Sequence, residues 1–176
     1  MSEDHFEGEE GTMIQDYTLE KLLGVGQFGV VWHAEKNKEF FALKIARLEE
    51  DIKRESNVLQ QIGKHNNIIQ LFTTLEHEVD TGNGVMVTHQ VLVLEALDMD
   101  LFSFMRKEYN KCIPVYFGKV LLSHMLKGIS YLAGLGITHT DIKPENMLIN
   151  CMRNDKNEVT HVRLVLADFG CACWDD

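Results

Sequence analysis

The sequence predicts an α+β fold in which an antiparallel sheet comes first and helices follow. Two observations support this prediction. Before residue 97, apolar residues occur in short β-prone runs that glycines and charged residues separate. After residue 97, they recur at helical spacing. We therefore expect a five-stranded antiparallel sheet with one helix, followed by the first part of a helical region.

The first three strands are expected over 17–23, 30–35 and 40–46, because these runs are rich in aliphatic and aromatic residues. Short glycine- and lysine-containing connections between them indicate an antiparallel meander. Apolar residues at helical spacing then predict a helix over 49–62, which Gly63 would end as a C-cap.

Two further strands, over 68–76 and 85–95, complete the expected sheet. The sequence Asp80-Thr-Gly-Asn-Gly between them suits a hairpin turn, because its glycines accept left-handed backbone conformations. These strands bring the predicted sheet to five.

Helices are expected next, a short one over 100–107 and a long one over 115–135. The long helix carries an apolar stripe made of Val120, Leu121, Met125, Ile129 and Leu132. Two apolar segments, 147–150 and 162–167, follow it and are joined by a polar connector. They predict a second hairpin.

Composition limits the class of protein. Residues 1–14 are polar and rich in Gly and Glu, so we expect a flexible acidic leader, followed by a first lobe with its hinge over 15–97 and a partial second lobe over 98–176. No signal peptide and no apolar run of bilayer length is seen, which favours an intracellular protein of the cytoplasm or nucleus without membrane partners. The net charge of −10 disfavours direct nucleic-acid binding and suits basic partners.

The four cysteines are scattered and form no Cys-x-x-Cys pair, so reduced thiols are expected. Cys171 and Cys173 form a redox or metal site in an alternative interpretation. Ordinary packing is the favoured one, because a structural zinc needs more ligands nearby.

The first motif with chemical meaning is Gly24-Val-Gly26-Gln-Phe-Gly29, between two predicted strands. Glycine lets the backbone approach phosphates closely, with its N–H groups facing anionic oxygens. No helix and no Gly-Lys-Ser/Thr follows, which disfavours a P-loop or Rossmann nucleotide-binding protein. An ordinary glycine-rich hairpin is the alternative.

Lys44 lies on the next strand among apolar neighbours, where an ammonium group is costly unless it is paired. Glu55 on the following helix is the best candidate for its carboxylate partner. Glu49 and Glu50 lie at the helix start, where a surface role favoured by the helix dipole explains them better.

The strongest motif is His139-Thr-Asp141-Ile-Lys143-Pro-Glu-Asn146, followed by Asp168-Phe-Gly170 at the end of an apolar strand. This spacing matches a phosphoryl-transfer loop. Asp141 would receive the substrate hydroxyl proton, Lys143 would face the γ-phosphate, and Asn146 and Asp168 would bind Mg²⁺.

With these motifs in order, residues 17–174 resemble the eukaryotic protein kinase superfamily. The catalytic loop, the segment 91–97 and the sequence Ala-Asp-Phe-Gly-Cys-Ala-Cys-Trp are most similar to SR-protein kinases and the CMGC group. The resemblance implies a two-lobed protein-kinase-like fold, with ATP and Mg²⁺ as cofactors and a protein substrate that could be basic and rich in Arg and Ser. It also implies that Thr140, where many kinases have Arg, frees the enzyme from activation by loop phosphorylation.

The resemblance further assigns residues to the nucleotide site. It implies an adenine pocket, with Leu94 as gatekeeper, hinge contacts from the backbone and Asp100 near the ribose. The residues expected to bind the nucleotide are Leu23, Gly24, Gly26, Gly29, Val31, Ala42, Lys44, Glu95, Leu97 and Leu148.

The sequence ends at Asp176, shortly after Asp168, so the resemblance implies a kinase truncated after its Asp-Phe-Gly motif. The later helices that cover the long helix would be missing, and we expect either exposed apolar surface or a partner that covers it. Two functions follow. The first is a protein serine/threonine kinase catalytic region that transfers the γ-phosphoryl group of Mg-ATP, and the alternative is a truncated non-catalytic fragment that binds nucleotide or a partner.

Overall fold

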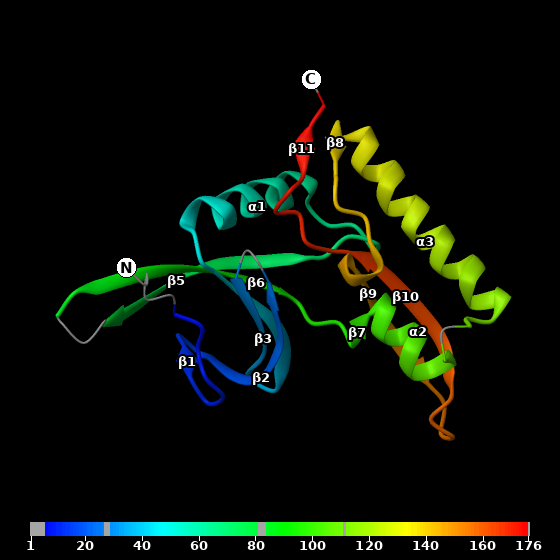
Figure 1. The fold of residues 1–176 in the computed structure, drawn as a ribbon, viewed down its shortest axis with the longest axis horizontal. Helices are drawn as coiled ribbons and strands as arrows, with labels where there is room; N and C mark the ends of the chain where they lie inside the picture. Colours follow the sequence, from blue (N-terminus) through cyan, green and yellow to red (C-terminus); the bar gives the residue numbers. More distant parts are fainter. Residues whose placement is uncertain (1–5, 27–28, 81–83, 111, 176) are drawn as a thin grey trace. The chain divides into compact units, whose positions relative to one another are not determined.

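The structure is a computed structural model that describes residues 6–26, 29–80, 84–110 and 112–175. The chain divides into two compact units (Figure 1). The first comprises Met1–Gln60 and Leu71–Ala96, and the second comprises Gln61–Gln70 and Leu97–Asp176. Neither unit is therefore continuous in sequence.

The first unit contains the predicted antiparallel sheet, with one strand more than expected. Its order is β1-β2-β3-β4-β6-β5, and every neighbouring pair is antiparallel. The predicted helix is present as α1 over the expected residues. The elements are β1 (Met13–Ile14), β2 (Tyr17–Gly26), β3 (Gly29–Lys36), β4 (Glu39–Ala46), α1 (Glu49–Ile62), β5 (Leu71–Asp80) and β6 (Met86–Glu95).

The two faces of this sheet differ in character because side chains alternate along each strand. One face carries the apolar core of the unit, which includes Trp32, Leu43 and Val93. The intervening positions on β3 and β4, among them Ala42 and Lys44, point to the opposite face. This second face is the one that carries the predicted nucleotide residues.

The expected flexible leader differs from the structure in its described part, residues 6–14. Ile14 is fully buried in the core and Phe6 packs against it. The indole Nε1 of Trp32 donates a hydrogen bond to the carbonyl oxygen of Glu7 at 2.7 Å. Two isolated apolar side chains in a polar segment give no periodic signal, which is why sequence reasoning missed this packing.

The turn between β5 and β6 was predicted from glycines that lie partly at 81–83, outside the described residues. The register of the two strands nevertheless fits a hairpin, because Asp80 pairs with Met86 and Glu76 pairs with Gln90.

The second unit combines helices with small sheets, as the change of pattern after residue 97 predicted. Helix α3 packs along β10 (Figure 1). The sheet β10-β9-β7 and the pair β11-β8 are antiparallel. The elements are β7 (Met99–Asp100), α2 (Leu101–Tyr109), α3 (Val115–Gly134), β8 (Ile137–Thr138), a 3-10 turn η1 (Pro144–Asn146), β9 (Met147–Arg153), β10 (Val159–Leu166) and β11 (Cys173–Trp174).

The predicted strand over 68–76 was wrong at its start, because β5 begins only at Leu71. Ile68 and Ile69 are buried within the second unit instead. The N–H of Ile69 donates to the carbonyl of Leu166 at 2.9 Å, and the N–H of Leu166 donates to the carbonyl of Asn67 at 2.9 Å. A short apolar run reads as a strand in sequence, but here it completes the core beside β10.

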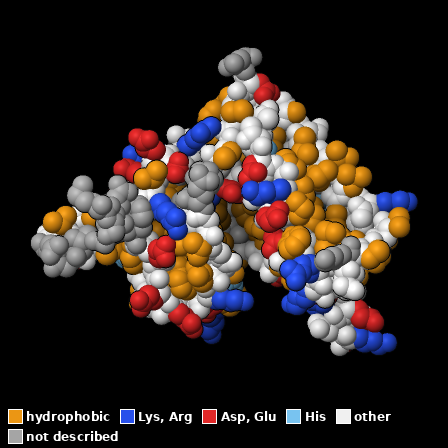
Figure 2. Space-filling view, viewed as in Figure 1, with side chains coloured by type: hydrophobic (Ala, Val, Ile, Leu, Met, Phe, Trp, Pro, Cys, Tyr) orange, Lys and Arg blue, Asp and Glu red, His pale blue; other side chains and the backbone are white. Residues whose placement is uncertain are grey.

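Helix α3 buries only part of its apolar stripe. Leu121 and Leu132 are buried as expected, and Val120, Met125 and Ile129 are half-buried. In contrast, Leu122 and Leu126 are 52% and 54% exposed. Hydrophobic side chains accordingly gather along the visible side of α3 in the space-filling view (Figure 2). No helix among the described residues is both long and apolar enough to cross a membrane.

Candidate active site

The candidate active-site residues fall into two groups, one within each unit. In the first unit, Lys44 of β4 and Glu55 of α1 form an ion pair with 2.6 Å between Nζ and Oε2. Both residues are buried, with 8% of the whole Lys44 residue and 2% of the whole Glu55 residue exposed. Two buried opposite charges are tolerated only as a closely bonded pair, so each one fixes the position of the other. The expected choice of Glu55 over Glu49 is supported by contact, since Glu49 pairs with Lys53 at the surface.

The glycine hairpin lies between β2 and β3, with Gln27 and Phe28 of its tip outside the described residues. Gly24 pairs with Val31, and Val31 pairs with Lys44, so the three form one row across the sheet. A Cβ on Gly29 would lie 2.0 Å from the carbonyl oxygen of Ile45, so the fold itself requires this glycine.

The fold places no such demand on the other two glycines of the hairpin. Among the residues that the structure describes, a Cβ on Gly24 would meet no atom within 4 Å, and one on Gly26 would meet only a backbone oxygen at 3.8 Å. Both residues are exposed. Packing therefore gives no reason for glycine at these two positions, whereas a ligand that approaches the backbone would.

The remaining predicted nucleotide residues of the first unit lie on strands of the same sheet. Ala42 pairs with Leu94, the expected gatekeeper, and both are buried. Leu23 is 45% exposed, and Glu95 ends β6 half-buried. Leu94 is thus buried on the face of the sheet that also carries Ala42 and Lys44, opposite to the apolar core.

In the second unit, Leu97 leads into a segment that is fastened to β9. The N–H of Asp98 donates to the carbonyl of Ile149 at 3.0 Å, and its carboxylate accepts from the N–H of Cys151 at 2.6 Å. Leu148, on the same strand, is half-buried and pairs with Asp100.

Asp100 itself is the N-cap of α2. One of its carboxylate oxygens accepts from the N–H of Ser103 at 2.7 Å, and the other accepts from the Ser103 hydroxyl at 2.6 Å. The Asp100 side chain therefore caps α2. The resemblance had implied a place near the ribose for this residue.

The catalytic-loop residues converge on one carboxylate. Asp141 Oδ2 accepts hydrogen bonds from Lys143 Nζ and from Asn146 Nδ2, both at 2.8 Å, and the Asp141 carbonyl accepts from the same amide at 3.0 Å. The hydrogen bond from Lys143 is the main reason that the pKa of Asp141 lies below its usual range, and the same bond raises the pKa of Lys143. Asp141 is therefore a carboxylate at neutral pH, with the ammonium group of Lys143 beside it.

His139 holds this loop to the strand that precedes Asp168. Its Nδ1 accepts from the N–H of Asp141 at 3.3 Å, which leaves Nε2 protonated to donate to the carbonyl of Ala167 at 3.0 Å. Its ring packs on Phe169, with ring centroids 4.6 Å apart. Burial lowers the pKa of His139, which favours the neutral ring that these two bonds require. The histidine is thus a structural support of the loop.

Asn146 and Asp168 are suited to a cation by their chemistry. The Asn146 side chain is buried and its nitrogen is engaged with Asp141, so its oxygen is the atom left for a metal. Asp168 has a left-handed backbone with φ of 63°. Among the described residues, no three His, Cys, Asp or Glu side chains gather into a metal site. Mg²⁺ needs only one or two protein ligands when phosphate and water supply the rest.

Sequence reasoning missed one contact that links these two motifs. The Thr140 hydroxyl donates to the carbonyl of Cys171 at 2.8 Å, and Thr140 adopts a φ of 66°, which is uncommon for a β-branched residue. The pairing of β8 with β11 continues this link, and Trp174 Nε1 donates to Gln61 Oε1 at 2.8 Å. No periodic or compositional signal marks a single hydroxyl-to-backbone bond, so the sequence could not predict it. The bond uses only the backbone of Cys171, whose thiol is exposed.

Known proteins resemble this chain over most of its length. The model of the protein kinase domain family matches residues 17–174. The serine/threonine-protein kinase SKY1 of Saccharomyces cerevisiae is 33% identical over 148 residues, which cover 76% of this chain and 20% of that protein. The DNA damage response protein kinase DUN1 of the same yeast is 31% identical, covering 89% of this chain and 33% of that protein.

A plant protein gives a similar result. The serine/threonine-protein kinase AFC1 of Arabidopsis thaliana is 30% identical over 144 residues, covering 78% of this chain and 30% of that protein. The chain therefore spans between a fifth and a third of the length of these relatives.

Proposed function

Because the chain belongs to the protein kinase domain family, we propose that it carries the ATP-binding and catalytic residues of a protein serine/threonine kinase. The observation that carries this proposal is the loop in which Lys143 and Asn146 both bond to the Asp141 carboxylate. In such a loop a carboxylate, an ammonium group and an amide lie within hydrogen-bonding distance, and we assign them as proton acceptor, positive charge and metal ligand. Phosphoryl transfer needs these groups, because its catalysis rests on positioning and charge stabilisation.

In this proposal, Asp141 accepts the proton of the substrate hydroxyl. Lys143, whose ammonium group lies 2.8 Å from Asp141, offsets the negative charge that develops on the transferred group. Lys44, held by Glu55, would contact the phosphates of the nucleotide. The lowered pKa of Asp141 keeps its carboxylate ionised throughout the neutral range, which is the form that can accept a proton.

The glycine hairpin supports nucleotide binding for a separate reason. Gly24 and Gly26 are glycines without a packing cause, which is expected where backbone N–H groups approach phosphates. Val31 and Ala42 on the adjacent strands would contact the adenine, as would Leu23, and Leu148 would do so from the second unit. Glu95 and Leu97 would bond to the adenine edge through their backbone.

Mg²⁺ would be held by Asn146 and Asp168, which offer oxygen ligands, the kind that Mg²⁺ prefers. When bound, the metal neutralises phosphate charge. The hydrogen bond from Asn146 to Asp141 would keep the amide oriented, with its oxygen toward the cation.

A basic, Arg/Ser-rich protein substrate is the proposed target. It rests on the resemblance of residues 91–97 and 167–174 to SR-protein kinases and on the net charge of −10, which attracts cationic chains. Within the cell, the proposed location is the cytoplasm or the nucleus.

A non-catalytic binding role is the second candidate, and the exposed Leu122 and Leu126 of α3 favour it. Apolar side chains of this kind on one helix face are typical of a surface that contacts another protein. A chain with this role could still bind a nucleotide without transferring phosphate.

Calorimetry of the purified 176-residue chain with Mg-ATP tests the proposal, with Lys44→Met and Asp168→Ala as variants. We expect saturable binding that both variants abolish or weaken at least tenfold. Binding should then be followed by phosphate transfer to an Arg/Ser-rich peptide, with Asp141→Asn as the inactive control. A folded chain that binds no Mg-ATP would overturn the catalytic proposal, and binding without any transfer would favour the non-catalytic role.

A further inference from the structure

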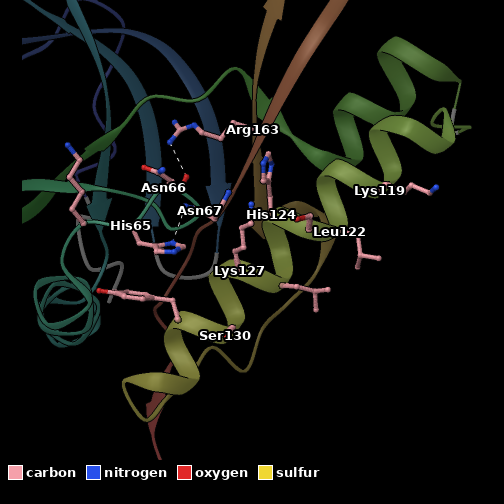
Figure 3. A pocket seen from close by; sticks show the side chains of 13 residues that line it. His65, Asn66, Asn67, Lys119, Leu122, His124, Lys127, Ser130 and Arg163 are labelled. Carbon is pink, nitrogen blue, oxygen red and sulfur yellow. Dashed lines mark hydrogen bonds between the residues drawn. The ribbon is translucent and has the colours of Figure 1, made fainter.

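A groove unrelated to the candidate active site lies within the second unit. It runs between the segment 64–67 and helix α3, with Arg163 of β10 at one side, and has a volume of about 1200 Å³ (Figure 3). None of the residues assigned above to nucleotide, metal or catalysis lines it. It is therefore a separate feature that needs its own explanation.

The charge of this groove is opposite to that of the protein. Lys64, Lys119, Lys127 and Arg163 line it, and none of its described lining residues is acidic. The whole chain, in contrast, has 27 acidic residues against 17 lysines and arginines. The positive charge of the groove is therefore a local feature that the composition of the whole chain does not explain. Such a groove attracts anions locally.

The groove contains two histidines, and its charge affects the pKa of one of them. Burial lowers the pKa of His65 and of His124, and for His124 the nearby cations Lys127 and Arg163 lower it further. Both shifts favour the neutral form of the ring. A bound anion would raise these pKa values, because it would stabilise the imidazolium.

The walls of the groove are held in place before any ligand binds. The His65 ring stacks on Tyr131 with centroids 4.5 Å apart and an interplanar angle of 14°. The Tyr131 hydroxyl donates to the carbonyl of Ile62 at 2.8 Å, and Arg163 Nη1 donates to the carbonyl of Asn66 at 3.2 Å. A ligand would therefore cost little ordering of these groups.

The groove also has an apolar side. Figure 3 shows His124 and Arg163 on the side of α3 that faces Asn66, whereas the Leu122 side chain points away from Asn66. Leu122 and Leu126 are both more than half exposed. From residue 119 to residue 131, the helix extends about 18 Å at 1.5 Å per residue, the length of roughly five or six extended residues.

We propose that this groove binds an acidic peptide segment of a partner protein. Carboxylates of the segment would meet Lys64, Lys127 and Arg163, and its apolar side chains would meet Leu122 and Leu126. Lys119 and Lys127 lie about 12 Å apart along α3 at 1.5 Å per residue, and Lys64 and Arg163 lie on other elements. This spread exceeds one inorganic anion and matches a chain of carboxylates. The net charge of −10 opposes nucleic acid, whose binding depends on many phosphate contacts at once.

Fluorescence anisotropy tests this proposal with the full 176-residue chain and a labelled 12-residue peptide of Glu and Leu. We expect saturable binding that weakens as salt is raised, because exposed charges are screened. The double variant Lys64→Glu, Lys127→Glu should weaken binding about tenfold or more, which corresponds to about 1.4 kcal/mol. Lys156→Glu is the matched control, since Lys156 is an exposed lysine of the same unit outside the groove, and it should change affinity less than twofold.

Three results would overturn the proposal. These are equal loss in the groove variant and the Lys156→Glu control, equal binding of a peptide with Gln in place of Glu, and tighter binding of a single-stranded RNA than of the acidic peptide. Circular dichroism verifies the folding of each variant, and Lys127→Gln alone replaces the double variant if that one unfolds. Mg-ATP calorimetry on the same samples separates this result from the nucleotide proposal, because the groove variants should bind Mg-ATP normally.

Discussion

At the scale of single residues, the buried ion pair of Lys44 and Glu55 carries the largest energetic consequence. Their side chains are 10% and 3% exposed, so water cannot replace either partner. Removal of one partner leaves the other as a buried charge, which typically costs about 3–5 kcal/mol of unfolding free energy. Removal of both partners costs less, because no buried charge remains.

A double-mutant cycle tests this coupling. We expect Lys44→Met and Glu55→Leu each to lower the unfolding free energy by about 3 kcal/mol, and the double variant to lower it by clearly less than the sum. Urea denaturation measures the three differences. Additive losses would contradict the coupling. The double variant should still bind Mg-ATP at least tenfold more weakly than the unaltered chain, since the lysine proposed to contact the phosphates is absent.

His139 makes stability depend on pH. Burial lowers its pKa in the folded chain below the ordinary value of about 6.5, so the unfolded chain takes up a proton first as pH falls. The stabilising contribution of the neutral ring is therefore complete above pH 6.5 and is lost as pH falls from there toward the folded pKa. Protonated Nδ1 would also face the N–H of Asp141, from which it now accepts.

We expect the thermal midpoint of the chain to fall between pH 7.5 and pH 5.5, and to fall less in His139→Gln. The exposed His161 supplies the control, because His161→Gln should keep the slope of the unaltered chain. Scanning calorimetry at several pH values measures the change of the thermal midpoint with pH in each chain. An unchanged slope in His139→Gln would assign the acid sensitivity to His65, His77 and His124, whose pKa values burial also lowers.

At the scale of elements, helix α3 contains glycines with opposite environments. A Cβ on Gly128 would lie 2.9 Å from Leu166 Cδ1 and 3.0 Å from the carbonyl oxygen of Asn67. A Cβ on Gly118 would meet no atom within 4 Å. The same substitution should therefore have opposite effects at the two positions, because alanine favours a helix wherever it has room.

We expect Gly118→Ala to raise the unfolding free energy by roughly 0.5–1 kcal/mol, the usual gain of alanine over glycine in a helix. Gly128→Ala should lower it by about 1–3 kcal/mol, because the methyl group overpacks the contact with the segment 64–67. Denaturant titration of both variants provides the measurement. A stabilised Gly128→Ala chain would show that α3 is not tightly packed there.

Elements with strong periodicity were predictable, and single contacts were not. The helix over 49–62 was confirmed because apolar residues at helical spacing and a glycine at its end agree with each other. The strand expected from Ile68 was wrong at its start, because a short apolar run does not tell which core it enters. The Lys44–Glu55 pairing was predicted from the cost of a buried charge, whereas the Thr140 to Cys171 bond had no signal in the sequence.

At the scale of the whole molecule, the exposed leucines of α3 set how the chain behaves in solution. Leu122 and Leu126 contribute little to the folded core, since both are more than half exposed. Leu121, which directly precedes Leu122 on the same helix, is only 5% exposed and packs inward. Solubility and stability should therefore respond to different substitutions.

We expect the double variant Leu122→Ser, Leu126→Ser to reduce self-association without lowering the thermal midpoint. The matched control Leu121→Ala should lower the unfolding free energy by about 2–5 kcal/mol, because it opens a cavity. Light scattering coupled to size exclusion measures the first effect, and thermal unfolding measures the second. Unchanged association in the double variant would mean that another surface drives it.

The segment 61–70 limits how the gene can be divided. A break after Ala96 follows the point where the first unit ends, yet it would separate Ile68 and Ile69 from the strand that they cover. The product of codons 97–176 would leave the backbone of Leu166 without its partners at Asn67 and Ile69. During synthesis, residues 61–70 leave the ribosome early and wait for about a hundred more before β10 is made, so the two units cannot mature strictly one after the other.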